Sequence, residues 1–165
     1  MLARFQPTIK MNTSNSCNET VNCNLISQDS PGELLKKFLT EAKLKRQLVC
    51  GVYHAAQALE RTPSSILLCI LTEDSLHDVE ACIHSILIQA FCNANNIDLV
   101  KVDSEKKLSS LISHHSSQRH SKRDHQCVLV KNLKEGFGQP GQEFMQYFTQ
   151  TYGILHPPPV IALPG

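Results

Sequence analysis

The sequence predicts an α/β fold: a three-layer α/β/α sandwich with a mixed, four- to five-stranded sheet and helices on both faces. Short apolar runs of strand length alternate with longer segments in which apolar residues recur at helical spacing. The runs are apolar throughout rather than at every second position, which is typical of strands covered on both faces. We expect one domain, 30–165, after a flexible tail, 1–29, that is rich in Asn, Ser and Thr.

The first two expected helices have clear boundary signals. Residues 30–33 read SPGE, which combines an N-cap serine, a proline at the first helical position and a Glu three residues after the cap. A helix should therefore begin there and run to about Lys45. A second helix is expected over 51–61, because Pro63 prevents its continuation. Its buried residues should be Val52, Ala55, Ala56 and Leu59.

The rest of the chain continues the alternation of strands and helices. The prolines at 157–159 place the last strand at an edge of the sheet, since proline cannot donate to a ladder. The segment 114–125 is polar without periodicity, so it predicts a loop. Strands are expected at 66–72, 97–102, 126–131 and 157–164, and helices over 75–95, after Asp103 as an N-cap, and around Phe144, Phe148 and Tyr152.

Composition argues against several classes of protein. Sixteen basic and fifteen acidic residues leave a net charge of +1, so no overall field attracts the chain to nucleic acid. No stretch approaches the length of a membrane span, and the N-terminus lacks an apolar signal core. Seven cysteines occur, with no Cys-x-x-Cys pair that would indicate zinc. Those within apolar runs predict reduced core residues: Cys69, Cys82, Cys92 and Cys127.

Candidate catalytic residues lack the motifs that would support them. Cys69 and Cys127 fall in the middle of strands, and neither a nucleophile elbow nor a pair of metal ligands accompanies His54 or His84. The glycine-rich GFGQPG at 136–141 lacks the Lys-Ser/Thr of a phosphate-binding loop and predicts a turn. We therefore expect no enzymatic activity, no cofactor and no metal.

A group of histidines in the polar loop admits several interpretations. Their spacing matches no standard metal motif, and basic residues lie between them. A solvated loop accounts for the pattern, while a nuclear-import or weak nucleic-acid segment and a metal site are the alternatives. The histidines are His114, His115, His120 and His125.

Four blocks resemble one known family. They read GVYHAAQAL (51–59), IHSILIQAFCNANNIDLVKV (83–102), QCVLVKN (126–132) and PVIALP (159–164). In this order and spacing they are similar to the growth-arrest and DNA-damage-inducible stress sensors, of which this chain would be a divergent member. The resemblance implies a stress-induced, non-enzymatic adaptor of nucleus and cytoplasm that forms homodimers. Its implied partners are an upstream mitogen-activated protein kinase kinase kinase, the sliding clamp, and cyclin-dependent kinase complexes with their inhibitors.

The same region resembles a ribosomal-protein-like superfold that binds kinked RNA. Its RNA binders have Gly-x-Asn-Glu-x-x-Lys before a helix that ends in Glu-Arg, and this chain reads GVYHAAQALER. Tyr53, His54 and Gln57 stand where Asn, Glu and Lys would contact RNA. The resemblance thus implies the fold without specific nucleic-acid binding, and a divergent RNA-binding module is the alternative function.

The long helix over 75–95 predicts a self-association surface. It is apolar over more than half of its circumference, more than one face of a sheet can bury. We expect Ile83, Ile86 and Ala90 to face the sheet while other apolar residues turn away from it. A neighbouring helix of the same chain or a second copy would cover those, and the matching helix of the family serves self-association. The expected self-association residues are Ile83, Leu87, Ile88 and Phe91.

Acidic residues follow the strand at 66–72, where relatives have a longer acidic loop implicated in kinase binding. Two interpretations account for them: negative charge that complements the start of the next helix, or a docking site for the kinase partner. The residues are Glu73, Asp74, Asp78 and Glu80.

Overall fold

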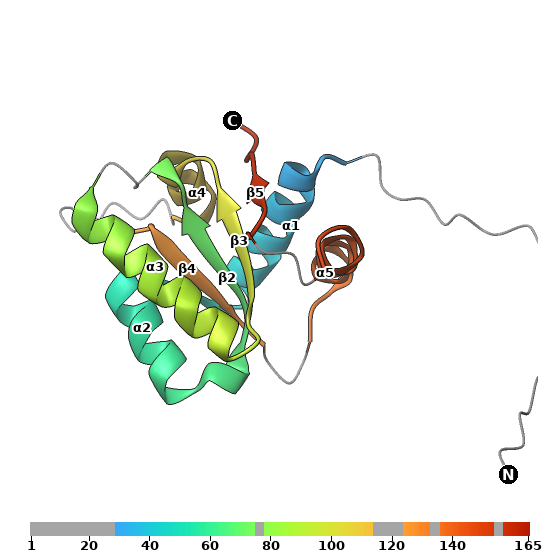
Figure 1. The fold of residues 1–165 in the computed structure, drawn as a ribbon. Helices are drawn as coiled ribbons and strands as arrows, with labels where there is room; N and C mark the ends of the chain where they lie inside the picture. Colours follow the sequence, from blue (N-terminus) through green and yellow to red (C-terminus); the bar gives the residue numbers. More distant parts are fainter. Residues whose placement is uncertain (1–28, 75–77, 114–123, 133–135, 154–156) are drawn as a thin grey trace, which may run out of the picture.

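The computed structural model describes residues 29–74, 78–113, 124–132, 136–153 and 157–165, and nearly all of the expected tail lies outside them. In this part of the chain, helices cover both faces of a five-stranded sheet (Figure 1), which confirms the predicted α/β/α sandwich. The helices are α1 (Pro31–Leu44), α2 (Val52–Arg61), α3 (Val79–Ala94), α4 (Glu105–Ile112) and α5 (Gln139–Thr151). The strands are β1 (Leu48–Cys50), β2 (Ile66–Thr72), β3 (Asp98–Val102), β4 (Cys127–Lys131) and β5 (Val160–Ile161).

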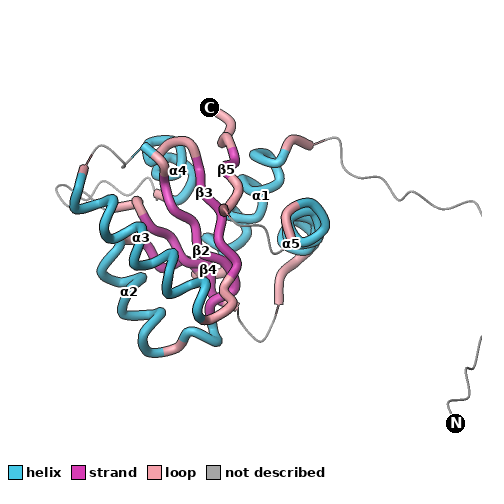
Figure 2. Tube along the Cα trace, viewed as in Figure 1, coloured by secondary structure: helices cyan, strands magenta, loops and turns pink. Residues whose placement is uncertain are grey.

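The sheet is mixed, with the order β1-β4-β2-β3-β5. Strands β2, β3 and β5 are parallel, whereas β4 runs antiparallel to both β2 and β1. At the centre, Ile70 pairs with Val100 on one side and with Val128 on the other. The last strand lies at an edge, as predicted, and Figure 2 shows β2, β3 and β4 crossing the middle of the molecule.

Each face of the sheet has its own core. On one face the side chains of β2, β3 and β4 pack with α1, α4 and α5, where the rings of Phe38 and Phe144 stack with centroids 5.1 Å apart. On the other face Cys69, Leu99 and Leu129 pack with α2 and α3. Because every central strand is buried on both sides, the uniformly apolar runs in the sequence are accounted for.

Several boundaries differ from the prediction. Strand β1 was not expected, and β5 has two residues in place of the predicted 157–164, because the prolines that precede it have no N–H to donate to the ladder. Helix α3 begins at Val79 after the N-cap Asp78, while residues 75–77 lie outside the described part. The predicted turn at 136–141 ends early, because α5 begins at Gln139.

Two capping residues had contrasting outcomes. Ser30 caps α1 as predicted, since its hydroxyl accepts a 3.3 Å hydrogen bond from the N–H of Glu33. Asp103 was wrongly assigned to α4, whose N-cap is Ser104. The Asp103 carboxylate instead accepts a hydrogen bond from the N–H of Leu163 at 2.9 Å and pairs with Lys107 at 2.8 Å, which holds the C-terminal segment against the sheet.

Candidate functional site: the outer face of α3 and an acidic pocket

Helix α3 presents an apolar surface to solvent. Val79 is 76% exposed, Ile86 60% and Leu87 61%, and Ile83 and Phe91 are exposed beside them. Ala90 and Ala94 continue the same face. We call these seven residues the apolar face of α3. Contiguous exposed apolar surfaces on small proteins mark interaction sites more often than isolated apolar residues do.

The expected orientation of this helix was wrong. Ile83 and Ile86 point to solvent, whereas Ile88 is 5% exposed and packs on the sheet with Cys92. The buried stripe also includes Ala81, and its small residues let the helix approach the sheet closely. The spacing of apolar residues could not predict which side of α3 faces the sheet, because the exposed side is the more hydrophobic one. Ile88 is therefore a core residue rather than part of an exposed surface.

The predicted acidic residues lie after β2 and at the start of α3. The Asp78 carboxylate accepts a 3.0 Å hydrogen bond from the N–H of Glu80, and the Asp74 carboxylate accepts a 2.8 Å hydrogen bond from the N–H of Glu105 at the start of α4. Glu73 lies 3.9 Å from the ammonium of Lys101. Asp74 and Asp78 thus bind the ends of two helices, while Glu80 stays exposed.

An open pocket of about 580 Å³ gathers two of these acids with two more that the prediction missed. Asp78 and Glu80 come from the start of α3, and Glu105 and Asp124 come from segments further along the chain. His84 and Tyr53 also line the pocket. We call this the acidic pocket. Glu105 and Asp124 escaped the prediction because only the folded sheet brings these segments together.

Asp124 also occupies the N-terminus of α2. Its carboxylate accepts hydrogen bonds from the N–H of Val52 at 3.1 Å and from the N–H of Gln126 at 2.9 Å. Gly51, the N-cap residue of α2, has no side chain for this purpose, and its φ of +96° favours glycine. The N-terminus of a helix favours an anion, and at α2 the carboxylate of Asp124 supplies that negative charge.

The candidate catalytic cysteines are buried together, apart from the exposed candidate His54. Cys69, Cys92 and Cys127 have no exposed surface and form one thiol cluster between the sheet and α3. Hydrogen bonds with the other two thiols, together with burial, raise the pKa of Cys69, so its reactive thiolate form is disfavoured. His54 is exposed on α2, outside that core.

Two further predictions concern metal sites and membranes. No three His, Cys, Asp or Glu side chains of the described residues are placed to hold a metal ion. Three of the loop histidines, His114, His115 and His120, lie outside the described residues. His125 is buried rather than solvated, and its main-chain N–H donates a hydrogen bond to the Glu105 carboxylate at 3.2 Å. Within the described ranges, every helix is too short or too polar to cross a membrane.

Comparison with known proteins gives close relatives. The growth arrest and DNA damage-inducible protein GADD45 alpha of Cricetulus griseus is 35% identical over 113 residues, which cover 63% of this chain and 68% of that protein. GADD45 beta of Bos taurus is 32% identical over 120 residues, 69% of this chain and 75% of that protein. GADD45 gamma of Homo sapiens is 29% identical over 135 residues, 80% of this chain and 84% of that protein.

The fold is also found in a solved structure of a protein with unknown function from Bacillus halodurans C. It has a TM-score of 0.50 and 17% identity, and it covers 70% of this chain and 95% of its own. At that identity the likeness concerns the fold alone. A model of the family of ribosomal proteins L7Ae, L30e and S12e and of Gadd45 matches residues 33–132. Taken with the relatives above, this match shows that the chain belongs to the L7Ae/L30e/S12e/Gadd45 family as a GADD45-like member.

Proposed function

We propose that this protein is a stress-inducible, non-enzymatic adaptor that binds and activates an upstream mitogen-activated protein kinase kinase kinase. The names of the GADD45 relatives refer to growth arrest and DNA damage, which supports a role in stress response. The observation that carries the proposal is the position of the acidic pocket directly beside the exposed apolar face of α3. Such a pairing of an apolar centre with a charged rim is typical of protein interfaces.

The two surfaces have different tasks in this proposal. The apolar face of α3 self-associates. In a two-fold dimer this exposed apolar face of one copy would be covered by the same face of the other. The acidic pocket lies at the N-terminal end of the same helix and meets basic residues of the kinase. Charge complementarity of this kind mainly speeds encounter and sets orientation. The sliding clamp, and cyclin-dependent kinase complexes with their inhibitors, are proposed as further partners in the nucleus and cytoplasm.

Glu80 provides the cleanest test of the kinase contact. The carboxylates of Asp74 and Asp78 accept hydrogen bonds from helix N–H groups. Changing them would therefore lower the stability of the fold as well as affinity for the kinase. Glu80 is exposed, and its carboxylate makes no hydrogen bond or ion pair with the described residues. Glu80→Lys should weaken binding to the kinase kinase kinase roughly fivefold, because it reverses one charge at the rim of an interface. The weakening should be smaller at high salt.

The matched control is Glu60→Lys. Glu60 is exposed near the C-terminal end of α2, whereas the acidic pocket adjoins the N-terminal end of that helix. Affinity for the purified kinase domain is measured by biolayer interferometry at low and physiological salt, together with kinase activity. Equal affinities for Glu80→Lys, Glu60→Lys and the natural sequence would mean that the kinase binds elsewhere.

A further inference from the structure

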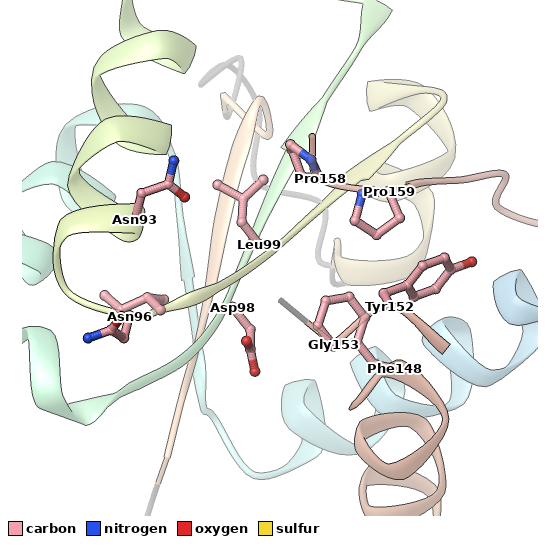
Figure 3. Close-up of a pocket in the computed structure, with 10 residues that line it drawn as sticks. Asn93, Asn96, Asp98, Leu99, Phe148, Tyr152, Gly153, Pro158 and Pro159 are labelled. Atoms are coloured by element: carbon pink, nitrogen blue, oxygen red, sulfur yellow. The ribbon is translucent and has the colours of Figure 1, made fainter. Parts of the chain in front are cut away.

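A second pocket, of about 250 Å³, lies at the other end of α3. There the C-terminal ends of α3 and α5 lie on either side of the start of β3 (Figure 3). Asn93 and Asn96 line it from the end of α3, and Phe148 and Tyr152 from the end of α5. Pockets for drug-sized molecules have volumes of about 300–1,000 Å³. This pocket is smaller and suits one amino-acid side chain.

Among the described residues that line this pocket, the charged group is the carboxylate of Asp98, the first residue of β3. It lies between the two helix ends in Figure 3. Among the described residues this carboxylate has no hydrogen-bond or ion-pair partner, and burial raises its pKa above the ordinary 3.8. Lys101 of the same strand points to the opposite face of the sheet and lies near Glu73. A partly desolvated carboxylate that has no partner among the described residues favours a cation.

The two helix ends add to this preference. The C-terminus of an α-helix carries a partial negative charge, which lysine or arginine in the last turn commonly offsets. Neither α3 nor α5 has a basic residue in its last turn. The pocket therefore combines one carboxylate with two helix C-termini that have no basic side chain in their last turns.

The walls of the pocket distinguish an organic cation from a metal ion. Phe148, Tyr152, Pro158 and Pro159 give it a largely apolar lining. Such walls can cover an aliphatic stem, and the face of a tyrosine or phenylalanine attracts ammonium and guanidinium groups. One carboxylate is too few ligands for a structural metal ion, and the described residues contain no metal-binding group of three.

We propose that this pocket binds one basic side chain, arginine or lysine, of a partner protein. The Asp98 carboxylate pairs with the cationic head, and the aromatic and proline side chains cover the stem. This contact is separate from the acidic pocket, because the two lie near opposite ends of the 16-residue helix α3. It gives the adaptor a second, single-residue recognition site that does not depend on the kinase being the partner.

The probe is N-acetyl-arginine amide, and N-acetyl-citrulline amide is its uncharged control of nearly the same shape. Both are titrated into the ¹⁵N-labelled full chain and followed by amide shifts in NMR spectra. The arginine probe should shift the amides of residues 96–99 and 152–153, and citrulline should bind at least about tenfold more weakly, as expected for loss of a charge-assisted contact. Equal binding of the two probes, or no shift at tens of millimolar, would overturn the proposal.

The variant Asp98→Asn tests the carboxylate itself. It keeps the shape of the side chain and breaks no hydrogen bond with the described residues, so it should fold, which circular dichroism checks. It should weaken the arginine probe at least about tenfold, while Glu60→Gln, an exposed carboxylate on α2, should leave binding unchanged. Shifts confined to the acidic pocket, or unaltered binding by Asp98→Asn, would refute the assignment.

A carboxyl-carbon titration of Asp98 gives an independent readout. A cation beside the carboxylate favours its ionised form, so the arginine probe should lower the pKa of Asp98 and citrulline should not. Arginine binding that leaves the Asp98 titration unchanged would place the cation elsewhere and contradict the proposal.

Discussion

At the residue scale, single carboxylates fix contacts that local sequence patterns do not predict. Asp124 binds the N-terminus of α2, Asp74 binds that of α4, and Glu41 of α1 binds that of α5. Each supplies a negative charge to helix N–H groups from another segment. Sequence rules for capping consider residues next to the helix. They therefore predicted Ser30 correctly and failed for Asp103.

Glu41 gives a test of such a contact. Its carboxylate accepts hydrogen bonds from the N–H groups of Gly138 and Gly141, the latter at 2.9 Å, and pairs with Lys45 at 2.7 Å. Burial alone would raise its pKa, but these hydrogen bonds outweigh burial and lower it below the ordinary 4.5. Glu41→Gln should lower the free energy of unfolding at pH 7 by about 1–3 kcal/mol.

The pH dependence follows from the direction of that shift. A group whose pKa is lower in the folded chain stabilises it above the pKa of the unfolded chain, and this stabilisation is lost as the pH falls through the folded pKa. Urea unfolding of Glu41→Gln and the natural sequence should therefore differ most at neutral pH and converge below pH 4.5. Glu60→Gln, an exposed control on α2, should show no such convergence. A difference that persists unchanged in acid would mean that the charge of Glu41 is irrelevant.

At the element scale, α2 is the part of the chain that decides between an adaptor and an RNA-binding module. Tyr53 is 74% exposed, and its ring meets the His54 ring edge to face at 5.7 Å between centroids. These two side chains replace the Asn and Glu of RNA binders, and the Asp124 carboxylate adds a negative charge at the same helix end. A negative charge at this helix end should disfavour phosphate.

We accordingly expect no specific binding to kinked RNA. A labelled kink-turn RNA is titrated with the protein at physiological salt, because non-specific phosphate contacts grow as salt falls. An unkinked duplex of the same composition serves as competitor. Weak binding that the competitor removes is the expected result. Submicromolar binding that survives the competitor would replace the adaptor proposal with an RNA-binding function.

At the scale of the whole molecule, the sequence predicted the layers better than the arrangement within them. Uniformly apolar runs revealed the buried strands, and the prolines at 157–159 revealed an edge. Strand β1 has three half-buried residues, too few for a pattern. The sequence does not show which stripe of α3 faces the sheet, because an apolar residue such as Ile88 is compatible with either the buried or the exposed side of the helix. The acidic pocket combines distant segments, so no local pattern contained it.

Self-association is the prediction that belongs to the complete molecule. We expect a homodimer in which the apolar face of α3 meets its copy. Leu87 is 61% exposed at the middle of that face, and fully burying such a side chain contributes about 1.5–3 kcal/mol. Leu87→Glu would place an unpaired carboxylate in the interface, which costs more than the lost burial alone. The variant should therefore be monomeric at concentrations where the natural sequence is dimeric.

Two controls separate the interface from the fold. Leu44→Glu changes a leucine that is 80% exposed on α1 and should leave the dimer intact, whereas Ile88→Glu changes a residue that is 5% exposed on the inner side of α3 and should unfold the chain. Analytical ultracentrifugation gives the association state, and thermal melting gives stability at a concentration where all samples are monomeric. Because Leu87 points to solvent in the monomer, Leu87→Glu should melt at nearly the temperature of the natural sequence. A natural chain that stays monomeric at high micromolar concentration, or a Leu87→Glu dimer of unchanged affinity, would show that this face binds something other than a second copy.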